Sequence, residues 1–142
     1  MNLKLQTDFG LRILIYLART GRRATLDEIA QFFDISREHL VKVGQALTAH
    51  GWVQSTRGRS GGLDLAVSAD DVDVGDVVAA LEGRNGVLQC VAEPDVCRLE
   101  PGCRLRRRLM VAEDAFYAAL SGLSLADLIR RPASHHGLTD IT

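Results

Sequence analysis

The sequence predicts a mainly α protein with one small β-hairpin, arranged as a winged helix-turn-helix followed by a long C-terminal dimerisation helix. Apolar residues recur at helical spacing in several stretches, which indicates amphipathic helices. The glycine-rich stretch "RGRSGG" (57–62) separates two short strand-like segments, as in a hairpin. The chain has 142 residues, of which 46% are apolar, so it has the length of one domain and enough apolar side chains for a core.

The first two helices are predicted from their caps and their apolar faces. Thr7 is expected to cap a helix over residues 8–19, which Gly21 ends. Its apolar face consists of Leu11, Leu14, Ile15 and Ala18. The stretch "TLDE" (25–28) has the form of a capping box and predicts a second helix that runs to Phe33. The side chains of this helix expected to face the core are Ile29, Phe32 and Phe33.

A third helix follows after a tight turn at residues 34–36. Ser36 is expected to cap this helix, which extends over residues 37–50. Its inner stripe consists of Leu40, Val43, Gly44 and Leu47. Its outer face is polar and carries Glu38, His39, Lys42 and Gln45. Two helices joined by a short turn, the second with a polar outer face, are typical of a helix-turn-helix.

The rest of the chain predicts a wing and a long helix. Residues 52–56 and 63–67 form the expected hairpin, and Asp73 caps a helix that reaches Leu81. A long helix over residues 103–120 has an apolar stripe of about 25 Å, which is too long for so small a core to cover alone. The stripe consists of Leu105, Leu109, Ala112, Phe116 and Leu120. A partner helix is therefore predicted to cover it, in a homodimer.

These elements predict four regions. A DNA-binding winged helix-turn-helix is expected over residues 1–82 and a cysteine-bearing loop over residues 83–103. The dimerisation helix region is expected over residues 104–130, and a flexible tail over residues 131–142.

Charge and position point to DNA as the partner of the first half. The chain has a net charge of −1, but residues 1–68 carry nine Lys/Arg against six Asp/Glu, a net +3. A basic wing tip and the first turns of a recognition helix are where such proteins contact phosphates and base edges. The expected DNA-binding residues are Arg37, His39, Lys42, Arg57, Arg59 and Ser60. The alternative is a bundle of packed helices without a ligand, or contact with phosphate alone.

All three cysteines lie in the expected loop, as Cys90, Cys97 and Cys103. Their C-x6-C-x5-C spacing lacks the close pairs and the fourth ligand of a usual zinc site. Soft thiolates gathered on one loop suit iron–sulfur chemistry, for which a fourth ligand must come from elsewhere. Unliganded cysteines, a thiol-oxidation switch, and an enzyme or metal carrier remain alternatives. No general base or cofactor fingerprint accompanies the thiols, so no enzyme activity is expected.

The chain shows neither a signal peptide nor the roughly 20-residue apolar run that a membrane helix needs. A cytoplasmic location without membrane contact is therefore expected, and cytoplasmic thiols stay reduced. His135 and His136 could bind a metal, but a solvated tail is the simpler interpretation.

Several motifs resemble those of a known family when they are taken in order. They are "TDFGLRILIYLA" (7–18), "ISREHLVKV" (35–43), "TRGRSGGLDLA" (56–66), "VGDVVAALEG" (74–83), the three-cysteine loop and "CRLRRRL" (103–109). This set is similar to the winged-helix iron–sulfur regulators that include the cluster-assembly regulator IscR. Within that family it most resembles the repressors that sense nitric oxide. The resemblance covers about residues 1–130.

The resemblance implies a homodimer that binds operator DNA and holds an iron–sulfur cluster through Cys90, Cys97 and Cys103. It implies [4Fe–4S] rather than [2Fe–2S], with Asp8 of the partner subunit as the fourth ligand. Nitric oxide would destroy the cluster and release the DNA. A related regulator that senses cluster status or thiol oxidation is the alternative. Two residues do not depend on the resemblance alone or depart from it. Asp8 also suits a helix N-terminus, and Glu38 stands where the family commonly has Asn.

Overall fold

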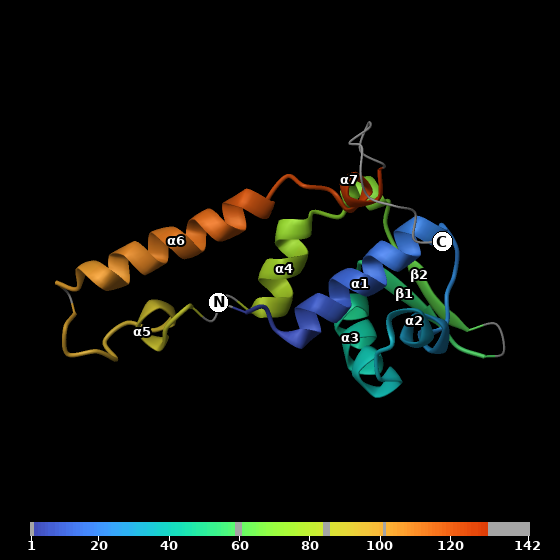
Figure 1. The fold of residues 1–142 in the computed structure, drawn as a ribbon, viewed down its shortest axis with the longest axis horizontal. Coiled ribbons are helices and arrows are strands. Elements are labelled where there is room, and N and C mark those ends of the chain that lie inside the picture. Colours follow the sequence, from blue (N-terminus) through green and yellow to red (C-terminus); the bar gives the residue numbers. More distant parts are fainter. Residues whose placement is uncertain (1, 59–60, 84–85, 101, 131–142) are drawn as a thin grey trace.

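The computed structural model describes residues 2–58, 61–83, 86–100 and 102–130, and Figure 1 shows its fold. The helices and strands, in chain order, are α1 (Leu5–Thr20), α2 (Leu26–Phe33), α3 (Arg37–Ala49), β1 (Val53–Thr56), β2 (Gly62–Leu65), the 3-10 turn η1 (Ala69–Asp71), α4 (Val74–Glu82), α5 (Gln89–Ala92), α6 (Arg104–Leu120) and α7 (Leu125–Ile129). The predicted fold class, mainly α with a small β-hairpin, is confirmed. Arg59, Ser60 and residues 131–142, with the two tail histidines, lie outside the described part of the chain.

The core is built around α1, which packs against α3, α4, α7 and β2. Its buried side chains include Ile13, Leu14 and Leu17, each at most 2% exposed. The predicted inner stripe of α3 is confirmed, since all four of its residues are buried. β1 and β2 pair in antiparallel register, with Val53 opposite Leu65 and Thr56 opposite Gly62. Val53 and Leu63 turn into the core, so the hairpin is held on the helices by its own buried residues.

The start of α1 differs from the prediction. The helix begins at Leu5, and Lys4 occupies the N-cap position without a side-chain cap bond. Thr7 therefore lies inside the first turn, is fully buried, and donates a hydrogen bond to Glu82 at the end of α4. The prediction that Thr7 caps α1 is wrong because this long-range bond, which only the tertiary structure supplies, uses its hydroxyl instead.

The second helix follows its predicted cap but not its predicted burial. Thr25 Oγ1 accepts a hydrogen bond from the Glu28 backbone nitrogen at 3.1 Å. Ile29 is fully buried, whereas Phe32 is 64% exposed and stands edge-on to the rings of Tyr16 and Phe33. Eight residues provide one narrow inward face, which Ile29 and the half-buried Phe33 fill, so Phe32 falls at its edge.

The long helix α6 extends away from the core, past α4 and beside α5 (Figure 1). None of its residues is buried within one subunit, and Leu105 and Val111 are each 62% exposed. Its C-terminal end is fixed to the start of α4. Asp73 Oδ2 accepts from the Gly122 backbone nitrogen at 2.6 Å, and Val74 N donates to Leu123 O at 2.8 Å.

Two short helices were missed by the sequence analysis. α5 lies within the expected loop. α7 lies within the range 104–130 and packs against α1 and η1, with Leu125 and Ala126 buried. The sequence contains a pattern that predicts the start of α7, because Ser124 and Asp127 form a complete capping box. No helix in the described ranges is long and apolar enough to cross a membrane.

Candidate nucleic-acid interface and cysteine loop

The turn between α2 and α3 is closed by backbone bonds. Asp34 adopts a left-handed conformation (φ 53°), and the Ile35 nitrogen donates to Ala30 O at 3.0 Å. An aspartate tolerates this conformation better than most side chains. The turn directs the start of α3 outward, and the whole first turn of the helix is exposed apart from the buried Leu40. The structure thus forms the predicted helix-turn-helix.

Three of the predicted DNA-binding residues lie on the exposed face of α3, namely Arg37, His39 and Lys42. Arg37 Nε lies 2.9 Å from Asp27 Oδ1, and their side chains are 58% and 74% exposed. An ion pair in water contributes at most about 1 kcal/mol, so a phosphate can compete for Arg37. The His39 ring lies 6.1 Å from the Phe9 ring, which places it near the first turns of α1.

The wing and α3 together form an open groove of about 430 Å³. Arg57 lies at the end of β1, is exposed, and lines this groove. Three polar residues that were not predicted as DNA-binding also line it, namely Gln45, Thr48 and Ser55. The sequence places Gln45 on the outer face of the third helix, so its exposure beside the DNA-binding residues could be predicted. The position of Ser55 could not, because the wing's orientation toward α3 depends on tertiary packing.

The wing is fixed to the segment that precedes α2. Ala24 and Leu63 exchange two backbone hydrogen bonds, of 3.1 and 2.8 Å. Arg23 Nε lies 2.7 Å from Asp64 Oδ2, which adds an ion pair across the same junction. Strands of a wing fixed in this way relative to α3 are suited to a duplex, because both elements must meet one rigid surface.

The three cysteines are free and half-buried. Cys90 belongs to α5, Cys97 follows in the connecting segment, and Cys103 is the N-cap of α6. Cys103 Sγ accepts a hydrogen bond from the Arg106 nitrogen at 3.4 Å, and the Arg106 side chain donates to the Cys90 carbonyl. The thiols therefore lie on one segment that is bonded to the start of α6. Three thiols are a donor set that fits iron–sulfur chemistry.

Asp8, the predicted fourth ligand, lies in the first turn of α1. Its carboxylate accepts from Arg12 Nε at 2.9 Å, and both side chains are 42% exposed. Among the residues that the structure describes, no three His, Cys, Asp or Glu side chains of one subunit are arranged to hold a metal ion. Within one subunit, therefore, the three cysteines do not form such a group together, and Asp8 is not brought to them.

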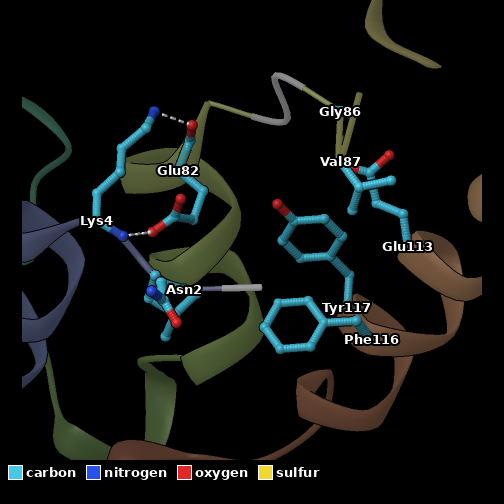
Figure 2. A pocket seen from close by; sticks show the side chains of 9 residues that line it. Asn2, Lys4, Glu82, Gly86, Val87, Glu113, Phe116 and Tyr117 are labelled. Carbon is cyan, nitrogen blue, oxygen red and sulfur yellow. Dashed lines mark hydrogen bonds between the residues drawn. The ribbon is translucent and has the colours of Figure 1, made fainter. Parts of the chain in front are cut away.

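A cavity of about 320 Å³ lies where α6 meets the start of α1 and the end of α4. Figure 2 shows the rings of Phe116 and Tyr117 projecting from α6 toward Lys4 and Glu82. The Lys4 backbone nitrogen donates to Glu82 Oε1 at 2.8 Å, and its ammonium donates to the Glu82 carbonyl. The long helix thus meets the winged-helix body at the residues that tie α1 to α4.

Comparison with known proteins gives one family and several related structures. Residues 3–131 match the model of the Rrf2 family, which is described as an iron-dependent transcriptional regulator. A crystal structure of oxidised CymR from Staphylococcus aureus is 26% identical, with a TM-score of 0.73 over 94% of this chain and 100% of that one. CymR of B. subtilis, described as the global cysteine regulator, is 27% identical, with a TM-score of 0.72 over 91% and 96%. IscR of T. potens shares the fold at 24% identity, with a TM-score of 0.69 over 91% of this chain and 86% of that one.

Proposed function

The chain belongs to the Rrf2 family of transcriptional regulators, and on that premise we propose that it is a DNA-binding repressor that senses nitric oxide through an iron–sulfur cluster. Its nearest functional type would be the NsrR repressors. One observation carries the proposal. The segment that holds all three thiols is hydrogen-bonded to α6, and no residue of α6 is buried within one subunit.

DNA would be bound by two copies of the α3 face and the wing. Arg37, His39 and Lys42 would enter the major groove, while Arg57, Arg59 and Ser60 would contact the backbone or the minor groove. Recognition helices of a dimer must lie about one helical turn, roughly 34 Å, apart to reach successive grooves. A change in the angle between the two subunits would therefore be enough to release the operator.

The dimer would form through α6. Leu105 and Val111 are each 62% exposed and Met110 is 38% exposed in one subunit, so a second α6 would bury apolar surface that water now contacts. The helix also carries its arginines near its start, at residues 104 and 106–108, and its acids Glu113 and Asp114 further along. An antiparallel partner helix would bring opposite charges together.

The cluster would be held by Cys90, Cys97 and Cys103, with Asp8 of the partner subunit as the fourth ligand. A [4Fe–4S] cluster is favoured over [2Fe–2S]. When bound, the cluster supplies iron that nitric oxide attacks. Asp8 is half-exposed and pairs with the equally half-exposed Arg12, so its carboxylate remains accessible to a second subunit.

Coupling to DNA would pass through packed elements. The cysteine loop is bonded to α6, α6 packs on α4, α4 packs on α1, and α1 packs on α3. The junction between α4 and the end of α6 is tight, because a Cβ on Gly75 would lie 2.9 Å from the Ser121 backbone nitrogen. Rigid contacts of this kind transmit a shift of one helix to the next rather than absorbing it.

An anaerobic titration tests the proposal. The protein is purified without oxygen, its absorption spectrum and iron content are measured, and duplexes selected by it from a random library serve as the DNA probe. Wild type should carry iron, lose its colour with nitric oxide, and release the duplex in parallel. Serine at any of the three cysteines should abolish iron binding. Colour loss without a change in DNA affinity would contradict nitric-oxide sensing.

Asp8 needs a control of its own, because an acid in the first turn of a helix also stabilises that helix. Asp76 occupies the first turn of α4 and provides the match. Asp8→Ala should retain some cluster, since water or a small thiol can fill one non-cysteine position, yet it should lose the response of DNA binding to cluster loss. Asp76→Ala should keep that response. Equal behaviour of the two variants would remove Asp8 from the ligand set.

A thiol-oxidation switch is the second candidate. It is favoured by three half-buried free thiols and by the similarity to a CymR that was crystallised in an oxidised form. A colourless protein from anaerobic, iron-replete purification, whose DNA affinity changes with peroxide, would support this function over the cluster.

A further inference from the structure

We infer that Arg106 and Glu100 form an ion pair that holds the cysteine loop in its folded arrangement, with Arg106 as a positioning residue. The inference rests on the proposed function for what the thiols bind. The arrangement of the loop itself can be measured in protein that carries no iron, so the two can fail separately.

Arg106 contacts two of the three cysteine residues. Its Nε donates to the carbonyl of Cys90, and its backbone nitrogen donates to Cys103 Sγ at 3.4 Å. The same Nε lies 2.5 Å from Glu100 Oε1. Arg106 is in the first turn of α6, so its backbone is fixed by a 17-residue helix. The side chain therefore connects Cys90 and Glu100 of the loop to the long helix α6.

Glu100 contacts the third cysteine residue and the turn between it and Cys90. The Glu100 nitrogen donates to Cys97 O at 3.1 Å, and Glu100 Oε2 accepts from the Asp95 nitrogen at 2.8 Å. Asp95 adopts a left-handed conformation (φ 63°), which an aspartate tolerates better than most residues. The Glu100 carboxylate accepts from the backbone of this turn, so Glu100 fixes the turn as well as forming the ion pair.

The Glu100–Arg106 pair is more buried than the Asp8–Arg12 pair on the surface. The side chains of Glu100 and Arg106 are 11% and 23% exposed, against 42% for both members of the Asp8–Arg12 pair. A half-buried, charge-assisted contact is screened less by water than an exposed one. Removing one partner would leave the other partly desolvated without its counter-charge, and the loop would open to hydrate it.

The short helix α5 needs this contact. A single turn of four residues is unstable alone, because one turn cannot offset the entropy of its own nucleation. The Cys90 carbonyl is among its terminal carbonyls, which have no partner further along such a short helix. Arg106 supplies the missing donor. The position of Cys90 thus depends on a side chain 16 residues away.

Amide hydrogen exchange of iron-free protein tests the arrangement. Arg106→Ala should speed the exchange of residues 89–95 roughly tenfold, as expected when a charge-assisted bond that closes a local structure is lost. Arg107→Ala is the matched control, since it removes the same charge from the exposed side chain one residue along α6. Equal exchange in the two variants would overturn the inference. Glu100→Gln gives the same test if Arg106→Ala fails to fold.

A charge swap separates the ion pair from the bond to Cys90. In Glu100→Arg with Arg106→Glu, the pair is restored, but residue 106 can no longer donate to a carbonyl. Exchange at α5 should stay fast in the swap. Exchange as slow as in wild type would show that Arg106 acts only through its charge, and the assignment of Arg106 as the donor that positions Cys90 would be wrong.

Reconstitution with ferrous iron and sulfide links the arrangement to the ligand. Arg106→Ala should take up less iron than Arg107→Ala and show an altered electron paramagnetic resonance spectrum after reduction. Normal uptake and an unchanged spectrum would overturn the positioning role. If wild type takes up no iron while Arg106→Ala still speeds exchange, the cluster proposal fails and the arrangement of the loop stands.

Discussion

Thr7 at the start of α1 donates a hydrogen bond from its hydroxyl to the carboxylate of Glu82 at the end of α4, over 2.5 Å. The same carboxylate accepts from the Lys4 backbone nitrogen at 2.8 Å. Glu82 and Lys4 both line the cavity between α6 and the winged-helix body (Figure 2). Asp8 is the next residue along the chain after Thr7. The Thr7–Glu82 bond therefore joins the segment that carries the proposed fourth ligand to the helix that leads into the cysteine loop.

Thr7→Val should test the strength of this junction. Valine keeps the shape but removes the donor, and Thr7 is fully buried, so the unfolding free energy should fall by about 1 kcal/mol. Urea denaturation at neutral pH measures it. Thr20→Val, at the other end of α1, is the control, because its hydroxyl bonds only to nearby backbone carbonyls such as Tyr16 O. Equal effects of the two variants would contradict a special role for the Glu82 contact.

The DNA-binding face predicts a graded response to arginine removal. Arg57→Ala and Arg37→Ala should each weaken binding of the selected duplex and lower the slope of log affinity against log salt by up to about one unit. Arg59→Ala should do the same, although its position lies outside the described residues. Arg108→Ala removes the same charge from α6 and should leave the slope unchanged. Unaltered binding in all three wing and α3 variants would exclude this face.

The apolar stripe of α6, none of which is fully buried in one subunit, predicts a monomeric variant. Leu109→Glu should give monomers, because it would place an unpaired carboxylate in an apolar interface. Sedimentation velocity measures the mass. Arg19→Ala, at the exposed end of α1, is the control and should stay dimeric. A dimeric Leu109→Glu would show that the subunits join elsewhere.

Glu28 predicts a pH-dependent contribution to stability. Hydrogen bonds from Arg22, then from Tyr16, lower the pKa of Glu28 from 4.5 to about 2. Because the folded-state pKa lies below the ordinary value, the stabilisation is complete above about pH 4.5 and is lost as the pH falls toward 2. Glu28→Gln should therefore destabilise the protein at neutral pH, and the difference from wild type should shrink in acid. Urea titrations at several pH values check this, with the exposed Glu38→Gln as the control. A difference that is independent of pH would refute the ionic contribution.

Local rules determined most of the elements. The helices, the Thr25 and Asp73 caps and the wing follow from periodicity, capping residues and turn residues, all of which act within a few positions of the chain. The inner stripe of α3 could be read directly, since one helical face must be apolar to be buried. The same patterns placed Arg37, His39, Lys42 and Arg57 on exposed surfaces.

Tertiary structure decided what depends on distant partners. Thr7 looked like a cap by sequence, but Glu82, 75 residues away, uses its hydroxyl. Periodicity predicted that Phe32 is buried, but its neighbours fill the narrow inner face of α2 and leave it exposed. Arg106 was one of several arginines at the start of a helix, and only the folded loop brings the Cys90 carbonyl and Glu100 to it. Sequence periodicity reports which face of a helix is buried, whereas long-range polar contacts depend on how the helices are placed, and no local pattern encodes that.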